Sequence, residues 1–433
     1  MSLVASIAAL VLCCAMLIGT TFAWFTDSAS TAVNKIQAGT LDVQLLDESG
    51  NSLEGQTLAW QKAAGHESEE VLWEPGCTYK LQPIVIKNNG NLALKYKIVI
   101  TGIQGDAELN EAIEWTITNT SATTALDADH PLAAGASDTL TISGHMKESA
   151  GNEYQGLSIA GIAITVVATQ DTVEHDSNNN TYDEDAGYPV AANTQAELND
   201  VIASAQSGSA IPTKVVLPAG NFKLEDGTAQ NKNITISGTA DTVVTVVGDT
   251  GNQLNYQNGA TLAFEGVTIQ GQTAGNFGGI AHVAKTTFVN CTFNGKLTLY
   301  GDATFINCTF NNKSDYAIWT WGAKNAEFIG CTFHSGGKAL LLYGGAGSTE
   351  TPTTNLTVTD CVFDDDNTLT TDKAAIEIGN DYDAVYNLTV NNISVTGFAE
   401  NPAGISTGST IWANKNSMDQ NHLNVVIDGV DVY

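Results

Sequence analysis

The sequence predicts an all-β protein with two domains, a β-sandwich followed by a right-handed parallel β-helix that begins with a short cap helix. Three observations lead to this prediction. Short β-branched runs separated by turn residues fill the first 175 residues, one segment with helical spacing follows, and a pentapeptide pattern then recurs seven times. The chain of 433 residues is long enough to build two such domains with separate cores.

The charge balance limits the classes of partner. The formal net charge is −30 and the sequence pI is about 4.2, which disfavours nucleic acid and anionic membrane surfaces. All 17 basic residues are lysines, so no guanidinium is available for two-pronged recognition of phosphate or carboxylate.

Residues 1–23 have the pattern of an export signal. Leu3–Ile18 is apolar and uncharged, but it is shorter than the roughly 20 residues that cross a bilayer, and Ala23 is the expected last residue before cleavage. No Lys or Arg precedes this run, so we expect the true start to lie upstream. An uncleaved anchor is the alternative. The sequence therefore predicts a secreted, extracellular protein that leaves the membrane after cleavage.

Residues 24–175 have the pattern of a β-sandwich. Val85, Ile98 and Val99 lie in short alternating runs that end at Asn-Asn-Gly or Thr-Gly, and Pro75-Gly76 provides a turn. Ile159–Ala168 is a near-continuous β-branched run, as expected of one buried strand.

Three blocks of this region resemble a known family. They are GTTFAWFTD with NKIQAGTLDV, then Trp73–Ile100, then Asn152–Thr172. In this order they resemble the TasA/camelysin family, whose export signal is cleaved by the SipW-type peptidase of Gram-positive bacteria. The resemblance implies a jelly-roll-type sandwich and a place on the cell surface or in the biofilm matrix.

The resemblance also implies an assembly segment, which would add as a strand to a neighbouring copy. Its first residues are Trp24, Phe25, Thr26 and Asp27. Pairing of this segment within its own sheet is the alternative, because isolated sheet edges are usually covered.

Residues 176–192 are expected to form an acidic linker. Asp176, Asn178 and Asn180 have the spacing that opens a calcium loop, yet Thr181 stands where such a loop needs Gly. We therefore interpret the segment as a solvated connection.

Residues 193–433 predict the β-helix. Thr194 and Glu197 form a capping box for a helix, and seven pentapeptides follow at spacings of 17 to 37 residues, which suits coils with loops of variable length. The second position of each pentapeptide holds Gly, Asn or Asp, which enter left-handed geometry most easily. The third and fifth positions are apolar and should face inward. Four third positions are cysteines, which we expect to be buried free thiols: Cys291, Cys308, Cys331 and Cys361.

A second aligned strand carries the candidate binding site. Its apolar residues alternate with a set expected to face outward, where flat rings could stack against sugar faces. This set contains Tyr300, Trp319, Trp321, Tyr343 and Glu377. The alternative is that flanking loops fold over the rings and bury them.

The second domain also resembles the pectate-lyase-like family, which raises the question of catalysis. The main lyases of that family use an arginine base, which this chain lacks. Weak catalytic candidates are Glu377, Lys373, Asp366 and Asp381. Weak calcium candidates are Asp364, Asp365, Asp381 and Asp383, but we favour a solvated turn for such residues, because turns prefer Asp.

The sequence thus favours binding over catalysis and requires no cofactor, with calcium as an option. It predicts an exported surface or matrix protein whose sandwich mediates assembly or anchoring and whose β-helix binds a polysaccharide or cell-surface glycan. The alternative is a secreted polysaccharide lyase or glycoside hydrolase. Self-assembly by strand addition is a further expectation.

Overall fold

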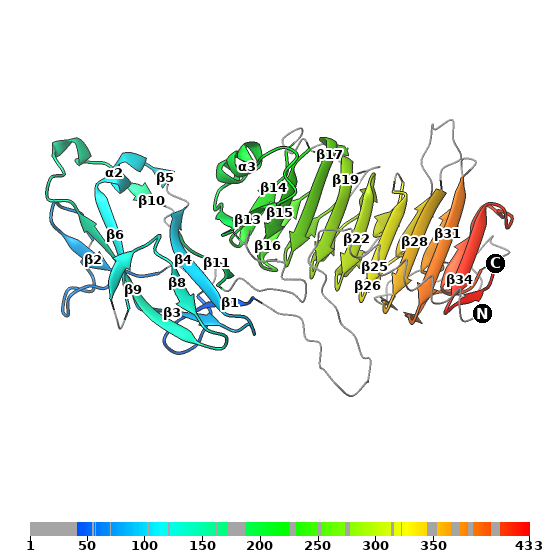
Figure 1. The fold of residues 1–433 in the computed structure, drawn as a ribbon, viewed down its shortest axis with the longest axis horizontal. Coiled ribbons are helices and arrows are strands. Elements are labelled where there is room, and N and C mark those ends of the chain that lie inside the picture. Colours follow the sequence, from blue (N-terminus) through cyan, green and yellow to red (C-terminus); the bar gives the residue numbers. More distant parts are fainter. Residues whose placement is uncertain are drawn as a thin grey trace, which may run out of the picture.

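The structure is a computed structural model in which the strands form two bodies along the chain (Figure 1). It describes residues 41–433 except 54–55, 57, 70, 102–103, 120–121, 161–162, 172–186, 226–230, 249–252, 273–277, 313–315, 322, 344–352, 365–372, 380–383 and 400–407. The predicted cleavage residue Ala23 and the assembly segment at Trp24, Phe25, Thr26 and Asp27 lie outside the described residues. No helix among the described residues is long and apolar enough to cross a membrane.

The first body is built from antiparallel sheets. The larger sheet has the order β1 (Val43–Leu46), β3 (Ile84–Asn88), β9 (Ser137–Met146), β6 (Ile113–Thr118), β7 (Thr123–Ala125), with β2 (Thr78–Lys80) paired to β9. The smaller sheet has the order β11 (Ala163–Gln170), β4 (Leu94–Thr101), β8 (His130–Leu132). At one end of this body lie the pair β10 (Ile159–Ala160) and β5 (Gln104–Gly105) and helix α2 (Ala107–Glu111), and the short helix η1 (Asn152–Tyr154) belongs to the same small cluster.

Alternating apolar residues of both sheets form one core. Ile84 and Ile86 of β3, Tyr96 of β4 and Ile142 of β9 are completely buried. The hydroxyl of Tyr96 donates a hydrogen bond to Oδ2 of Asp138 at 2.7 Å, and burial raises the pKa of Tyr96. The two sheets therefore share the interior that a sandwich requires.

The run Ile159–Ala168 is strand on both sides of residues 161–162, which lie outside the described residues. It contributes β10, which pairs with β5, and β11, which pairs with β4 over eight residues. Both pairings have the same antiparallel register, so the described parts of the run agree with the predicted strand.

The second body is a solenoid of parallel strands, in which helix α3 (Gln195–Ser204) follows the first short strand, β12 (Val190–Ala191). Thr194 and Glu197 form the predicted capping box, and Leu198 and Ile202 bury one face of the helix against the first coils. The coils build three faces.

The first face contains β12 (Val190–Ala191), β13 (Thr213–Val216), β15 (Asn233–Ser237), β17 (Gln253–Glu265), β19 (Gly279–Val289), β22 (Asp302–Ile306), β25 (Asn325–Ile329), β28 (Thr353–Thr359), β31 (Val385–Asn391) and β34 (Leu423–Ile427). The second contains β14 (Gly220–Lys223), β16 (Thr242–Thr245), β18 (Thr268–Gln270), β20 (Thr292–Asn294), β23 (Thr309–Asn312), β26 (Thr332–Ser335), β29 (Val362–Asp364) and β32 (Ser394–Thr396). The third, which we call the β21–β33 face, contains β21 (Leu297–Leu299), β24 (Ile318–Trp319), β27 (Leu340–Tyr343), β30 (Ile376–Gly379) and β33 (Trp412–Asn414), and joins the first through β19.

The second residue of every pentapeptide has a positive φ, as predicted. The values lie between 49° and 78° at Gly266, Asn290, Asn307, Gly330, Asp360, Asn392 and Gly429. Each coil therefore turns between its first and second face at a residue that tolerates left-handed geometry.

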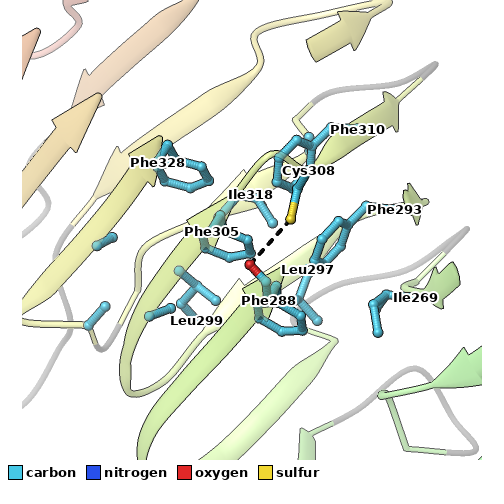
Figure 2. Packing of buried hydrophobic residues seen from close by; sticks show 14 of the residues in the cluster. Ile269, Phe288, Phe293, Leu297, Leu299, Phe305, Cys308, Phe310, Ile318 and Phe328 are labelled. Carbon is cyan, nitrogen blue, oxygen red and sulfur yellow. Dashed lines mark hydrogen bonds between the residues drawn. The ribbon is translucent and has the colours of Figure 1, made fainter. Parts of the chain in front are cut away.

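The solenoid interior holds aligned rows of thiols and phenyl rings, and Figure 2 shows Cys308 among the phenyl rings. The four predicted cysteines are buried free thiols, and Sγ of Cys308 donates to the carbonyl of Phe288 at 3.5 Å. Burial raises the pKa of Cys308 well above its ordinary value. The predicted phenyl row also stacks, with Phe293, Phe310, Phe333 and Phe363 at successive centroid distances of 4.6, 4.4 and 4.6 Å.

A second phenyl row was not anticipated. It stacks at 5.1, 4.9 and 4.4 Å and contains Phe264, Phe288, Phe305 and Phe328. Each of these residues stands two positions before the left-handed residue, so the pattern Phe-x-Gly/Asn marks it in the sequence.

The last pentapeptide is not a coil, contrary to the prediction. Val430 and Val432 are exposed at 61% and 44%, and β35 (Val430–Asp431) pairs antiparallel with β34. Asp428 and Gly429 both have positive φ, as in a two-residue hairpin turn. After β34 the chain folds back, and β35 pairs along the edge of the sheet.

Candidate functional site

The β21–β33 face positions the predicted site residues through its parallel register. One row of paired residues faces the hydrophobic core, because alternate residues of a strand point to opposite sides. This inward row is Leu297, Ile318, Leu340, Ile376 and Trp412. The neighbouring row, which points away from that core, is Thr298, Trp319, Leu341, Glu377 and Ala413.

Much of this second row is covered. Thr298, Leu341 and Glu377 are buried, at 1%, 8% and 3% exposure, so they do not form the open solvent face that the sequence pattern indicated. Trp319, Trp321, Tyr300 and Tyr343 are half-buried. These four aromatic side chains therefore keep part of their surface accessible to solvent.

Three of these rings form one aromatic group, which we call the platform: Trp319, Trp321 and Tyr343. The indole N–H of Trp319 donates to the carbonyl of Tyr343 at 3.1 Å, which ties β24 to β27. The ring of Trp319 meets Trp321 edge-on at 4.9 Å and Tyr343 at 6.2 Å. The buried ring of Tyr316 supports Trp319 from a further side at 5.8 Å.

Gly379 leaves the space that the ring of Tyr343 occupies. The ring of Tyr343 lies against Gly379, at the end of β30, so closely that any Cβ at that position would collide with it. Tyr343 and Gly379 are direct partners in the register of β27 and β30. Because Gly379 has no side chain, the ring of Tyr343 in the neighbouring coil can pack directly against the backbone of β30.

Glu377 carries the main charge of the face. Its Oε1 lies 3.5 Å from Nζ of Lys338 and 3.4 Å from Nζ of Lys415, and it accepts no hydrogen bond from the described residues. The side chain of Lys338 is buried, whereas that of Lys415 is 50% exposed. Lys415 also lies over the ring of Tyr343, with Nζ 5.9 Å from the centroid.

Sequence reasoning missed both lysines. Lys338 stands two residues before β27, and Lys415 follows β33 directly, so the coils on either side of β30 deliver one lysine each. The register of the coils was needed to find them, because neither lysine lies near Glu377 in the sequence.

Of the remaining candidates, the structure describes only Asp364 and Lys373. Asp364 lies at the end of β29 on the second face, where Oδ2 is 3.7 Å from Nδ1 of His334. Lys373 is half-buried just before β30, and its carbonyl accepts from the backbone of Ala399. Asp365, Asp366, Asp381 and Asp383 lie outside the described residues. Within the described ranges, no three His, Cys, Asp or Glu residues are grouped so that they could hold a metal.

The aromatic rings and the single carboxylate determine what chemistry the β21–β33 face can support. Flat rings with polar edges suit stacking against the apolar face of a sugar. Hydrolysis of a glycoside requires two carboxylates about 5 to 9.5 Å apart, and the strands of this face contribute only Glu377. The described strands of this face thus combine a half-buried aromatic group with one buried carboxylate.

Comparison with known proteins identifies the coiled body. Residues 242–422 match the family model described as a right-handed beta helix region. The second body is a right-handed β-helix. No curated protein and no solved structure matches the chain. The match confirms the β-helix part of the resemblance, and the TasA/camelysin and SipW part stays a prediction.

Proposed function

We propose that this protein is an exported cell-surface or biofilm-matrix protein whose β-helix binds a polysaccharide. The observation that carries the proposal is the platform, because its half-buried Trp and Tyr rings cluster outside a solenoid whose described phenylalanines are all buried in the core. Exposed aromatic surface of this kind is typical of ligand sites.

Binding to a glycan array tests the proposal. Trp321→Ala removes a ring that keeps part of its surface open, so affinity for the bound glycan should fall about tenfold, as expected for one lost aromatic contact. Trp60→Ala is the matched control, because Trp60 is also half-buried among aromatic rings but lies in the first body. Equal affinity of wild type and Trp321→Ala would refute the platform as the site.

A carbohydrate-active enzyme is the second candidate. It is favoured by the buried carboxylate of Glu377 beside two ammonium groups, an arrangement of the kind that enzymes use for acid–base chemistry. Incubation with acidic polysaccharides tests it by the appearance of unsaturated or reducing-end products. Product formation that disappears in Glu377→Gln would establish the enzyme, and no product with any substrate would leave binding alone.

The role of the first body in assembly or anchoring is part of the same proposal. Its support is the resemblance of the N-terminal blocks to fibre-forming relatives and the presence of sheet edges that can accept a strand. Deletion of residues 24–38 should abolish filaments in electron micrographs while thermal unfolding stays cooperative. Filaments formed by the truncated protein would exclude this route.

A further inference from the structure

Among the three charged groups Glu377, Lys338 and Lys415, Lys415 is the one that meets solvent. Its side chain is half exposed, whereas Glu377 and Lys338 are almost fully buried. Oε1 of Glu377 has less than 1 Å² of accessible surface, so this oxygen cannot reach a ligand in the described arrangement. Whatever docks here meets the ammonium group of Lys415 before it meets the carboxylate.

Three contacts hold Lys415 in place. Its backbone N–H donates to the carbonyl of Ile378 at 2.8 Å, its Nζ lies 3.4 Å from Glu377, and the same Nζ lies over the ring of Tyr343. A lysine side chain otherwise has many rotamers, so these contacts remove freedom that a ligand would have to remove. The ammonium group is therefore preorganised beside the platform.

We propose that Lys415 is a specificity-determining residue that donates hydrogen bonds to the oxygens of a sugar unit stacked on the platform. Glu377 is its positioning residue. This inference rests on the proposed glycan-binding function and names the polar group of that same site. An ammonium group has three donors and no acceptor, so the oxygen it recognises is a hydroxyl, a ring oxygen or a carboxylate of the sugar.

The assignment separates Glu377 from acid–base catalysis. A carboxylate that holds a lysine must stay in place and ionised, while a catalytic acid must reach the glycosidic oxygen. The second lysine, Lys338, approaches the same carboxylate from the buried side, and its attraction helps to offset the cost of keeping the carboxylate out of water.

A double-mutant cycle on the full-length protein tests the proposal, with cellohexaose as the neutral probe and polygalacturonate as the acidic probe. Lys415→Gln should weaken binding of at least one probe about tenfold, since hydrogen bonds from a charged donor are the strong ones. Glu377→Gln should weaken it less, and Lys415→Gln/Glu377→Gln should bind no worse than Lys415→Gln alone. Lys324→Gln, an exposed lysine next to β25, is the matched control and should bind as wild type.

A spectroscopic readout distinguishes direct contact from a general change of structure. After reductive ¹³C-methylation, the dimethyl-lysine signal assigned to Lys415 by its loss in Lys415→Gln should shift on addition of the bound probe, and that of Lys324 should not. If Lys415→Gln binds like wild type while Trp321→Ala does not, the inference is wrong and the proposed function stands. If the wild type binds neither these probes nor any glycan of the array, both fall together.

Discussion

Two groups of aromatic side chains, one inside the β-helix and one on its β21–β33 face, come from neighbouring coils but pack differently. The inner phenyl rows stack nearly parallel, with interplanar angles of 2° to 18° within each row. The rings of the platform meet edge-on at 66° and 73°. Inside, each coil repeats its neighbour, so equal rings fall into register.

The outer group breaks that repetition. Thr298, Trp319, Leu341 and Glu377 occupy equivalent positions of successive coils but share no chemistry. Repetition is what a solenoid needs for stability, because each coil contacts mainly its neighbours. A row that departs from repetition contributes less to that stacking and is the place to look for function.

The largest expected loss of stability comes from a substitution in the buried phenyl row that contains Phe310. Phe310→Ala removes a completely buried ring that stacks on Phe293 and Phe333, so it should lower the free energy of unfolding by about 3 to 5 kcal/mol. Chemical denaturation of the full chain measures this. Phe310→Leu keeps most of the volume and should cost clearly less. A loss below about 1 kcal/mol for the alanine variant would mean that the stack is not the stabilising element.

Substitution of a glycine with positive φ should give the next largest loss of unfolding free energy. Gly330 and Gly429 allow the contribution of backbone strain to be separated from that of crowding. Gly330 and Gly429 both have positive φ, but a Cβ on Gly330 would lie 2.5 Å from Oδ1 of Asn307, whereas Gly429 has open space around it. Gly429→Ala should cost about 1 kcal/mol from backbone strain alone. Gly330→Ala should cost at least about 1 kcal/mol more, from strain and crowding together. Equal losses in thermal unfolding would show that crowding at the corner is relieved without cost.

The platform supplies a smaller effect on stability. Trp319→Phe keeps a ring but loses the hydrogen bond to Tyr343, so unfolding should become easier by about 1 kcal/mol. The same variant should weaken glycan binding only a few-fold, because Trp321 remains. If Trp319→Phe abolished binding while Trp321→Ala did not, the roles of the two indoles would be reversed.

Much of the β-helix followed from the sequence because its repeats are local. The left-handed corners, the thiol row and the capping box each depend on a few adjacent residues, and all three are present. The hairpin at Asp428-Gly429 was missed because a repeat pattern was extended into a segment where the Asp-Gly pair already indicated a two-residue turn.

The charged group of the site could not be predicted in the same way. Lys338 and Lys415 reach Glu377 from two other coils, and the loops between coils vary in length. Without the register of β27, β30 and β33, nothing in the spacing of these residues brings them together. Local patterns therefore predicted the scaffold, while the site depends on contacts between coils.

Substitution in the buried thiol row should give the smallest loss of unfolding free energy at neutral pH. Its dependence on pH tests whether the repeated interior of the β-helix excludes water. Cys308→Val should cost less than about 1 kcal/mol at pH 7, since Val267 fills the same row in another coil. Burial raises the pKa of the Cys308 thiol, so the folded protein keeps its proton while the unfolded chain ionises near the ordinary value of about 8.5. The free energy of unfolding is thus unaffected by this group below that pH and falls as the pH rises above it, by up to about 1.4 kcal/mol per pH unit. Denaturation at pH 7 and pH 10 should therefore show a smaller loss of stability for Cys308→Val than for wild type. An identical loss in both proteins would mean that the row admits water, and the contrast between a dry repeated interior and a half-open irregular face would no longer hold.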